Sequence, residues 1–271
     1  MQTIIAAIIL GLVEGATEFV PVSSTGHLIL AGHALGFVGP RAAAFEIFIQ
    51  LGAILAVVWL YRSLLFRVVH DGIAVAESRR IILALLIAFL PAAIVGLLTH
   101  HWITAHLFTP SVVIAALIVG GIVILAIEHW RPAPRSETVQ QIDYRTALWI
   151  GLAQVFSLIP GTSRSGATIM GALLAGVGRP AAAEFSFLLA IPVMVAATGL
   201  DLWENRHLLS GSDALVFAIG FVVAFASALV VVRWLIRFVS HRSFAVFAWY
   251  RIVFGLALVA LLATGRSWIA K

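Results

Sequence analysis

The stretch from Gly11 to Leu28 reads GLVEGATEFVPVSSTGHL, and the rest of the chain is interpreted from it. It places Glu14 and Glu18 one helical turn apart inside an apolar run, so both carboxylates lie on the same helix face. Pro21 then ends the helix, because proline cannot donate a backbone hydrogen bond. Small polar or proton-handling groups follow directly, at Ser23, Ser24, Thr25, Gly26 and His27.

The composition is that of an integral membrane protein. Of the 271 residues, 62% are hydrophobic and 11% are charged, whereas soluble domains average about 25% charged residues. Several apolar runs reach the ~20 residues that a helix needs to cross a bilayer. The absence of cysteine excludes disulfides, thiolate metal sites and a cysteine nucleophile. The net charge of +5 includes no basic run, so we expect the lipid bilayer and no nucleic acid as a partner.

The apolar runs predict six transmembrane helices, at residues 45–61, 81–98, 110–127, 185–203, 214–235 and 246–262. Two shorter runs, 4–19 and 146–159, each stop at a proline and are followed by a half-length apolar run. A helix, a break and a half-helix are typical of a re-entrant hairpin, which must be buried in protein or line a wet cavity. The predicted fold class is therefore an all-α integral membrane protein with about six transmembrane helices and two re-entrant helical hairpins.

The second half of the chain repeats the first. Gly11-Leu12 corresponds to Gly151-Leu152, at an offset of 151 − 11 = 140, and Pro21 corresponds to Pro160. The flanking sequences VGPRAAA and VGRPAAA also agree. We predict a single membrane domain over 1–271 that contains an internal duplication, with repeat 1 at about 1–135 and repeat 2 at about 140–271.

Arginines in the connecting loops predict the orientation. The 62–80 and 128–145 connectors carry four and three arginines and are expected in the cytoplasm, together with 236–243. The 100–109 and 204–213 loops and both termini are then outside. Each half has an odd number of spans, so the two halves form an inverted-topology repeat. Their hairpins enter from opposite sides and meet near the midplane, as in inverted-repeat transporters.

Two carboxylates in a bilayer require compensation, since each costs at least ~2.5–3.5 kcal/mol at the centre of a helix. Glu14 and Glu18 predict a divalent-cation site or an acid–base pair, and oxygen ligands near phosphate favour Mg²⁺ or Ca²⁺. Solvation at the outer interface is the alternative. Backbone N–H groups after Pro21 would bind an anion, with a hydroxyl near His27 as a nucleophile. Simple helix capping is the alternative there.

The second hairpin supplies the partner sequence, PGTSRSGAT at 160–168. Arg164 stands between two serines at the start of a predicted half-helix, which fits bidentate recognition of phosphate. Interaction of Arg164 with lipid headgroups is the alternative. The inverted topology brings Arg164 toward Glu14 and Glu18. Phosphoryl transfer is the chemistry that this combination indicates: carboxylates with a metal, an arginine, a helix N-terminus and a serine–histidine pair.

Both motifs resemble those of the undecaprenyl-pyrophosphate phosphatase family of bacterial inner membranes. The likeness comprises EGxTEFxPVSSTGH at 14–27, PGxSRSGAT at 160–168 and the segments FEIFIQLG, EFSFLLAIP and AWYR, without a departure at the polar positions. The resemblance implies a metal-dependent phosphatase that converts undecaprenyl pyrophosphate, a polyprenyl pyrophosphate lipid substrate, into undecaprenyl phosphate and phosphate. That reaction recycles the carrier for cell-wall synthesis and confers bacitracin resistance. The resemblance also implies a multi-pass protein of the bacterial inner (cytoplasmic) membrane whose active site opens to the periplasm.

The motifs and the resemblance together assign the candidate site residues. The predicted catalytic residues are Glu14, Glu18, Ser24, His27 and Arg164, with Glu14 and Glu18 also holding the Mg²⁺ or Ca²⁺. The predicted substrate-binding residues are Ser23, Thr25, Gly26, Ser163, Ser165, Gly166 and Thr168. Either Ser24 attacks with His27 as its base, or His27 activates water; the sequence leaves both open. The oligomeric state is also open, and a homodimer is one option.

Other functional classes fit less well. Inverted repeats are frequent in transporters, so a transporter or flippase of lipid-linked phosphates is the alternative function. Glu14 and Glu18 would then bind a coupling ion, and Arg164 would hold a headgroup. A different integral phosphatase superfamily requires a histidine where this chain has Met170. A purely structural protein would not explain charged side chains within the membrane.

Overall fold

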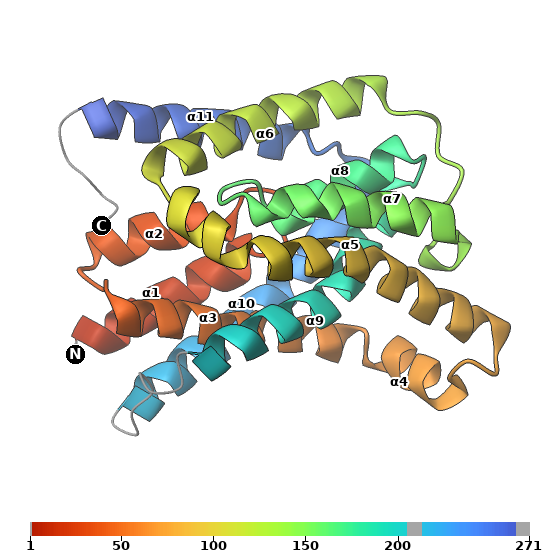
Figure 1. Cartoon of the computed structure of the whole chain (residues 1–271), viewed down its shortest axis with the longest axis horizontal. Helices are drawn as coiled ribbons and strands as arrows, with labels where there is room; N and C mark the ends of the chain where they lie inside the picture. The colour runs from red at the N-terminus through yellow and green to blue at the C-terminus, as the bar shows by residue number, and fades with distance from the viewer. Residues whose placement is uncertain (1, 205–212, 264–271) are drawn as a thin grey trace.

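The computed structural model describes residues 2–204 and 213–263, and every regular element in these ranges is helical (Figure 1). The first half contains α1 (Gln2–Thr17), α2 (Ser24–Ala34), α3 (Pro40–Leu60), α4 (Arg62–Asp71), α5 (Ala76–His106) and α6 (Pro110–Trp130). The second half contains η1 (Val139–Gln141), α7 (Tyr144–Gln154), η2 (Val155–Leu158), α8 (Arg164–Leu174), α9 (Arg179–Glu204), α10 (Ala214–His241) and α11 (Ala245–Ala263).

Six of the described helices are long and apolar enough to cross a membrane: α3, α5, α6, α9, α10 and α11. Their outer faces carry exposed large side chains such as Leu98, Val230 and Val253. In water such faces would be unfavourable, whereas in lipid they are solvated by hydrocarbon. The chain is thus an all-α, multi-pass integral membrane protein, as its composition predicts.

The helix ends differ from the predicted spans. Helix α5 continues to His106 through most of the loop predicted at 100–109, and α10 continues to His241 through most of the predicted 236–243 connector. These two loop predictions were wrong because hydropathy reports where lipid ends, whereas a helix continues into water until glycine, proline or another break stops it. The 62–80 connector is mostly helical, since α4 and the start of α5 lie within it.

The two short helical pairs form hairpins whose turns meet inside the bundle. In Figure 1, α1 and α2 enter from the left, α7 and α8 enter from the right, and both turns lie in the middle. The two hairpins touch directly, because the hydroxyl of Ser165 at the start of α8 donates to the carbonyl oxygen of Val20 in the first turn at 3.1 Å. This arrangement is consistent with re-entrant hairpins inserted from opposite sides.

Corresponding helices of the two halves pack in a matching pattern. Helix α1 packs on α10 and its counterpart α7 packs on α5, while α3 contacts α9 and α6 contacts α11. Equivalent glycines permit the first two contacts. A Cβ at Gly11 would lie 2.6 Å from the carbonyl oxygen of Gly220, and one at Gly151 would lie 2.5 Å from that of Ala88. Backbones therefore touch at matching places in both halves, which is consistent with an internal duplication.

Substitution of Gly151 by alanine is expected to destabilise the protein, although alanine favours helix formation by about 1 kcal/mol. The added methyl meets the α5 backbone, which cannot yield as a side chain can, and overpacking of this kind costs about 1–3 kcal/mol. We expect a lower midpoint of thermal unfolding in detergent. Gly199→Ala is the control, because nothing lies within 4 Å of the position that its added methyl would take, and the midpoint should stay level or rise. Equal midpoints of thermal unfolding for the two variants would contradict the close α5–α7 contact.

The end of the bundle opposite the α5–α6 connection holds two polar anchors (Figure 1). Glu128 on α6 accepts hydrogen bonds from Arg179 of α9 at 3.0 and 2.6 Å, and from the N–H of Phe244 at 2.6 Å. Asp143 caps α7 by accepting from the N–H of Thr146 at 2.7 Å, which lowers the pKa of that carboxyl. The Glu128 contacts tie α6, α9 and the α10–α11 loop together away from the hairpin turns, and the Asp143 contact stabilises the start of α7.

Candidate active site

The two half-helices begin at serines that share a rare backbone conformation. Ser23 precedes α2 with φ 71°, and Ser163 precedes α8 with φ 76°; they are the non-glycine residues with positive φ in the described part of the chain. Their separation is 163 − 23 = 140, the offset of the sequence repeat. Such conformations cost about 1–3 kcal/mol each and persist only where the surroundings enforce them. The strain therefore marks both hairpin tips as positions that the surrounding fold constrains.

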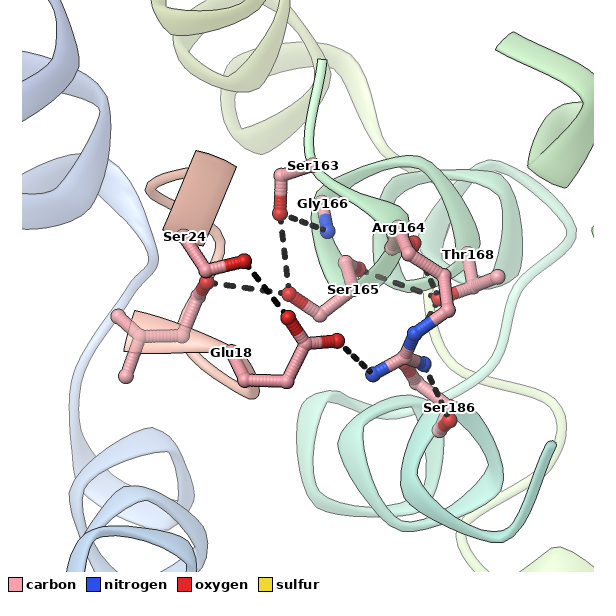
Figure 2. Close-up of polar contacts among 9 residues, drawn as sticks. Glu18, Ser24, Ser163, Arg164, Ser165, Gly166, Thr168 and Ser186 are labelled. Atoms are coloured by element: carbon pink, nitrogen blue, oxygen red, sulfur yellow. Dashed lines mark hydrogen bonds and ion pairs between the residues drawn. The ribbon is translucent and has the colours of Figure 1, made fainter. Parts of the chain in front are cut away.

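A series of three polar side chains joins the two hairpins (Figure 2). The hydroxyl of Ser24 donates to Glu18 Oε2 at 2.6 Å. The other carboxylate oxygen of Glu18, Oε1, accepts from Arg164 Nη2 at 3.3 Å. Both charged side chains are 9% exposed, so this ion pair is shielded from bulk solvent. The structure thus brings together three of the predicted catalytic residues, from opposite halves of the chain.

Arg164 retains binding capacity beyond this ion pair. Its Nη1 donates to the carbonyl oxygen of Ser186 on α9 at 2.9 Å, which fixes the plane of the guanidinium. Its Nε is buried and has no hydrogen-bond partner in the described residues. A buried unsatisfied donor is costly. This unpaired donor shows that protein groups alone do not saturate the guanidinium of Arg164.

Glu14 is completely buried, and neither of its carboxylate oxygens has a hydrogen-bond partner within the described ranges. Its counterpart in the repeat, Gln154, is equally buried and also lacks partners there. Two orphaned carboxylate oxygens need a proton or a cation. Hard divalent cations bind oxygen donors, and Mg²⁺ is often held by one or two carboxylates together with phosphate. The unpaired oxygens of Glu14 are therefore donors of the kind that such a cation binds, whereas both Glu18 oxygens already accept from Ser24 and Arg164.

The N-terminus of α2 differs from that of α8. Ser163 caps α8 by accepting from the N–H of Gly166 at 3.1 Å, and it also bonds the Ser165 hydroxyl at 3.1 Å. Ser23 makes no such capping bond to α2. The first N–H groups of α2 therefore remain for another acceptor, and a helix N-terminus favours an anion.

Four predicted substrate-binding residues are buried among neighbouring protein groups. Thr168 is buried, and its hydroxyl bonds the Ser186 hydroxyl at 2.7 Å. Ser165 is buried with its hydroxyl on Val20, and Gly26 is buried against α6. The backbone N–H of Gly166 donates to the Ser163 hydroxyl, which caps α8. These residues build the hairpins, because their polar groups are already satisfied by neighbouring protein groups.

His27 does not bond the Ser24 hydroxyl, so the predicted serine–histidine pair is not in direct contact. Its Nδ1 lies 2.7 Å from the Ser23 carbonyl oxygen, and its Nε2 lies 2.6 Å from the Tyr250 hydroxyl. Since a carbonyl can only accept, Nδ1 donates, and Nε2 of the neutral ring accepts from Tyr250. The ring also stacks on Phe254 with centroids 4.4 Å apart. His27 thus holds the strained Ser23, and Glu18 is the acceptor beside Ser24.

A cavity of about 460 Å³ lies over the Ser24–Glu18–Arg164 series. One end is polar and is lined by Glu18, Ser23, Ser24, Thr25, Gln50, Ser163 and Arg164. The walls are apolar and come mainly from α5 and α9, including Phe89, Leu97, Val193 and Leu200. The far end reaches His100, Thr104 and Asp201, near the α5–α6 connection. A polar end and apolar walls suit an amphipathic ligand with an anionic head.

The sequence did not identify several residues that shape the site. Ser186 orients Arg164, Tyr250 holds His27, and Gln50 lines the cavity. Tyr250 lies in the AWYR segment, which was recognised only as part of a family resemblance. Gln50 lies one helical turn from Glu46 in the apolar span predicted at 45–61, a pattern that suggests at most a supporting role.

Comparison with known proteins places the similarity over the whole site. A family model described as bacitracin resistance protein BacA matches residues 7–257, which include both hairpins. The undecaprenyl-diphosphatase of Dechloromonas aromatica is 51% identical over 257 residues, covering 95% of this chain and 94% of that protein. That of Nitrosospira multiformis is 54% identical over 262 residues, covering 97% and 96%. Undecaprenyl-diphosphatase 2 of Rhodospirillum rubrum is 54% identical over 269 residues, covering 98% of each chain.

Proposed function

The chain belongs to the bacitracin resistance protein BacA family, and we propose that its two hairpin tips form the active site of an undecaprenyl-diphosphatase. The enzyme hydrolyses undecaprenyl diphosphate to undecaprenyl phosphate and phosphate, which returns the lipid carrier to cell-wall synthesis. One observation carries the assignment to this site. The Ser24–Glu18–Arg164 series lies at the polar end of a cavity whose other walls are apolar.

The cavity suits both parts of the substrate. The isoprenoid chain stays among the apolar side chains of α5 and α9, while the diphosphate reaches the hairpin tips. There the uncapped N–H groups of α2 and the guanidinium of Arg164, which lines the cavity, bind phosphate oxygens. Thr25 and Ser163 add hydroxyls to the same wall. Because the cavity extends toward the predicted external end of the bundle, we propose that it opens to the periplasm of a bacterial inner membrane.

The contact between Ser24 and Glu18 suggests how the reaction begins. Ser24 Oγ attacks the terminal phosphorus and transfers its proton to Glu18, while the bond between that phosphorus and the bridging oxygen breaks. Undecaprenyl phosphate leaves, and water then hydrolyses the phosphoserine to phosphate. Arg164 neutralises the charge that develops on the transferred group. The carboxylates of Glu14 and Glu18 would hold a divalent cation, Mg²⁺ or Ca²⁺, which when bound would neutralise further phosphate charge.

Ser24→Ala is expected to lower kcat by about 10²- to 10³-fold, because the attacking oxygen is lost and only a less well-placed water can replace it. The wild type should give an acid-stable phosphoserine when the reaction with terminally labelled substrate is quenched, and the variant should give none. Thr17→Ala is the control, since its hydroxyl bonds the carbonyl oxygen of Val13 at 2.7 Å. Wild-type activity in Ser24→Ala would mean that water is the nucleophile.

The activity itself is tested with purified protein in detergent. With undecaprenyl diphosphate and Mg²⁺ or Ca²⁺, the protein should release phosphate and form undecaprenyl phosphate in equal amounts. A chelator should stop the release, and added cation should restore it. A protein that releases no phosphate in detergent, yet moves lipid-linked phosphate across a vesicle membrane, would instead be a transporter.

A further inference from the structure

Arg251 lies in the middle of α11 and is one of the largest fully buried side chains in the described structure, at 1% exposure. No carboxylate is paired with it there. Instead, all five N–H groups of its guanidinium donate to backbone carbonyl oxygens, which is the complete donor capacity of an arginine. The acceptors are Leu117 (3.3 Å), Ala116 (2.8 Å), Pro21 (3.2 Å), Gly161 (3.0 Å) and Thr162 (2.8 Å).

These carbonyls belong to three separate segments. Pro21 lies in the first hairpin turn, two residues before the strained Ser23, and Thr162 directly precedes the strained Ser163 in the second turn. Gly161 belongs to the same second turn. The remaining two acceptors, Ala116 and Leu117, lie on α6, a long helix packed along α11. One guanidinium therefore fastens both turns to each other and to a rigid helix pair. Conformations as strained as those of Ser23 and Ser163 need such external constraint.

Helix α6 is shaped to admit this side chain. A Cβ at Gly120 would collide with the guanidinium of Arg251, and one at Gly121 would lie 2.7 Å from the carbonyl oxygen of Ala248 on α11. Only hydrogen fits at these two positions. The two adjacent glycines of α6 thus make the space that the Arg251 side chain and the α11 backbone occupy.

We propose that Arg251 is a positioning residue, which holds the two hairpin tips in register so that Ser24 and Glu18 of one meet Arg164 of the other. It does not bind phosphate, because its donors are all occupied and its side chain is buried. The inference rests on the proposed function for its catalytic consequence, whereas the register of the hairpins is a structural property that can be measured without any reaction.

The first test is Arg251→Lys, which keeps the charge but supplies three donors in place of five. We expect kcat to fall about 10²-fold, as a displacement of ~1 Å can do, with KM within about threefold of the wild type. Arg179→Lys is the matched control, because Arg179 is an anchoring arginine that contacts Glu128 far from the turns. It should lose thermal stability without losing kcat. A wild-type kcat in Arg251→Lys, or a loss in both variants that only follows stability, would overturn the proposal.

The second test measures register directly. Because the chain has no cysteine, spin labels can be attached at Ala34→Cys on α2 and Leu174→Cys on α8, at the outer ends of the two half-helices. The distance distribution should be narrow in the parent and with Arg179→Lys, and broad with Arg251→Lys. An unchanged distribution would overturn the proposal even if the wild type releases no phosphate. If Arg251→Lys does not fold, Gly120→Ala, which displaces the guanidinium, must show the same loss of kcat and the same broadening.

Discussion

Replacing Glu18 with glutamine is expected to lower kcat by about 10⁴-fold, the largest effect of any single substitution in the site. The glutamine side chain has nearly the same shape, but it cannot take a proton from Ser24 Oγ, which lies 2.6 Å from Glu18 Oε2. It also removes the negative charge beside the buried guanidinium of Arg164 and weakens any cation shared with Glu14. Phosphate release from undecaprenyl diphosphate in detergent measures the loss.

Glu184→Gln is the matched control for this prediction. Glu184 is a half-buried glutamate on α9 that does not line the cavity. It should keep kcat within about threefold of the wild type. Circular dichroism and gel filtration should show that both variants are folded. An active Glu18→Gln protein would mean that this carboxylate neither accepts the serine proton nor organises the site.

Arg164→Ala is expected to lower kcat by about 10³-fold or more, the range known for arginines that stabilise a transferring phosphoryl group. The guanidinium combines an ion pair to Glu18, a bond to the Ser186 carbonyl and a free Nε. Lysine provides the charge without the planar set of donors, so Arg164→Lys should recover only part of the loss. Single-turnover measurements with saturating enzyme separate the chemical step from binding.

Arg145 is exposed, and Arg145→Ala is the control for removing an arginine outside the site. This variant should retain wild-type kcat. An Arg164→Ala protein whose KM rises while kcat stays unchanged would contradict the proposed role. In that case the arginine would bind substrate and transition state equally well. The same result would favour a headgroup clamp without catalytic function.

Much of the fold was predictable because a bilayer imposes simple rules. Apolar runs of sufficient length identified all six long helices, and Pro21 and Pro160 marked both hairpin turns. The repeat at an offset of 140 indicated that these turns belong together. The contact between Glu18 and Arg164 agrees with that expectation. Pairing across the membrane could be inferred here because charges within lipid must find partners.

The remaining features depend on contacts between distant segments. Nothing near His27 in the sequence indicates that its ring is held by Tyr250, 223 residues away, whereas proximity in sequence drew attention to Ser24. The family resemblance implied that Thr168 binds phosphate, whereas its hydroxyl bonds the Ser186 hydroxyl. The function of Arg251 was hidden for the same reason. Backbone carbonyls accept its five hydrogen bonds. Because every residue has a backbone carbonyl, residue types in the sequence do not indicate these contacts.

The central claim is that residues from opposite hairpins act on one phosphoryl group, and a double-mutant cycle between Glu18→Asp and Arg164→Lys tests it most directly. Both substitutions preserve charge, so the remaining activity stays measurable. If the two side chains act as a unit, kcat of the double variant will fall much less than the product of the single losses, with a coupling of about 1–3 kcal/mol. Strictly multiplicative losses would show that Glu18 and Arg164 act independently and would contradict a shared active site.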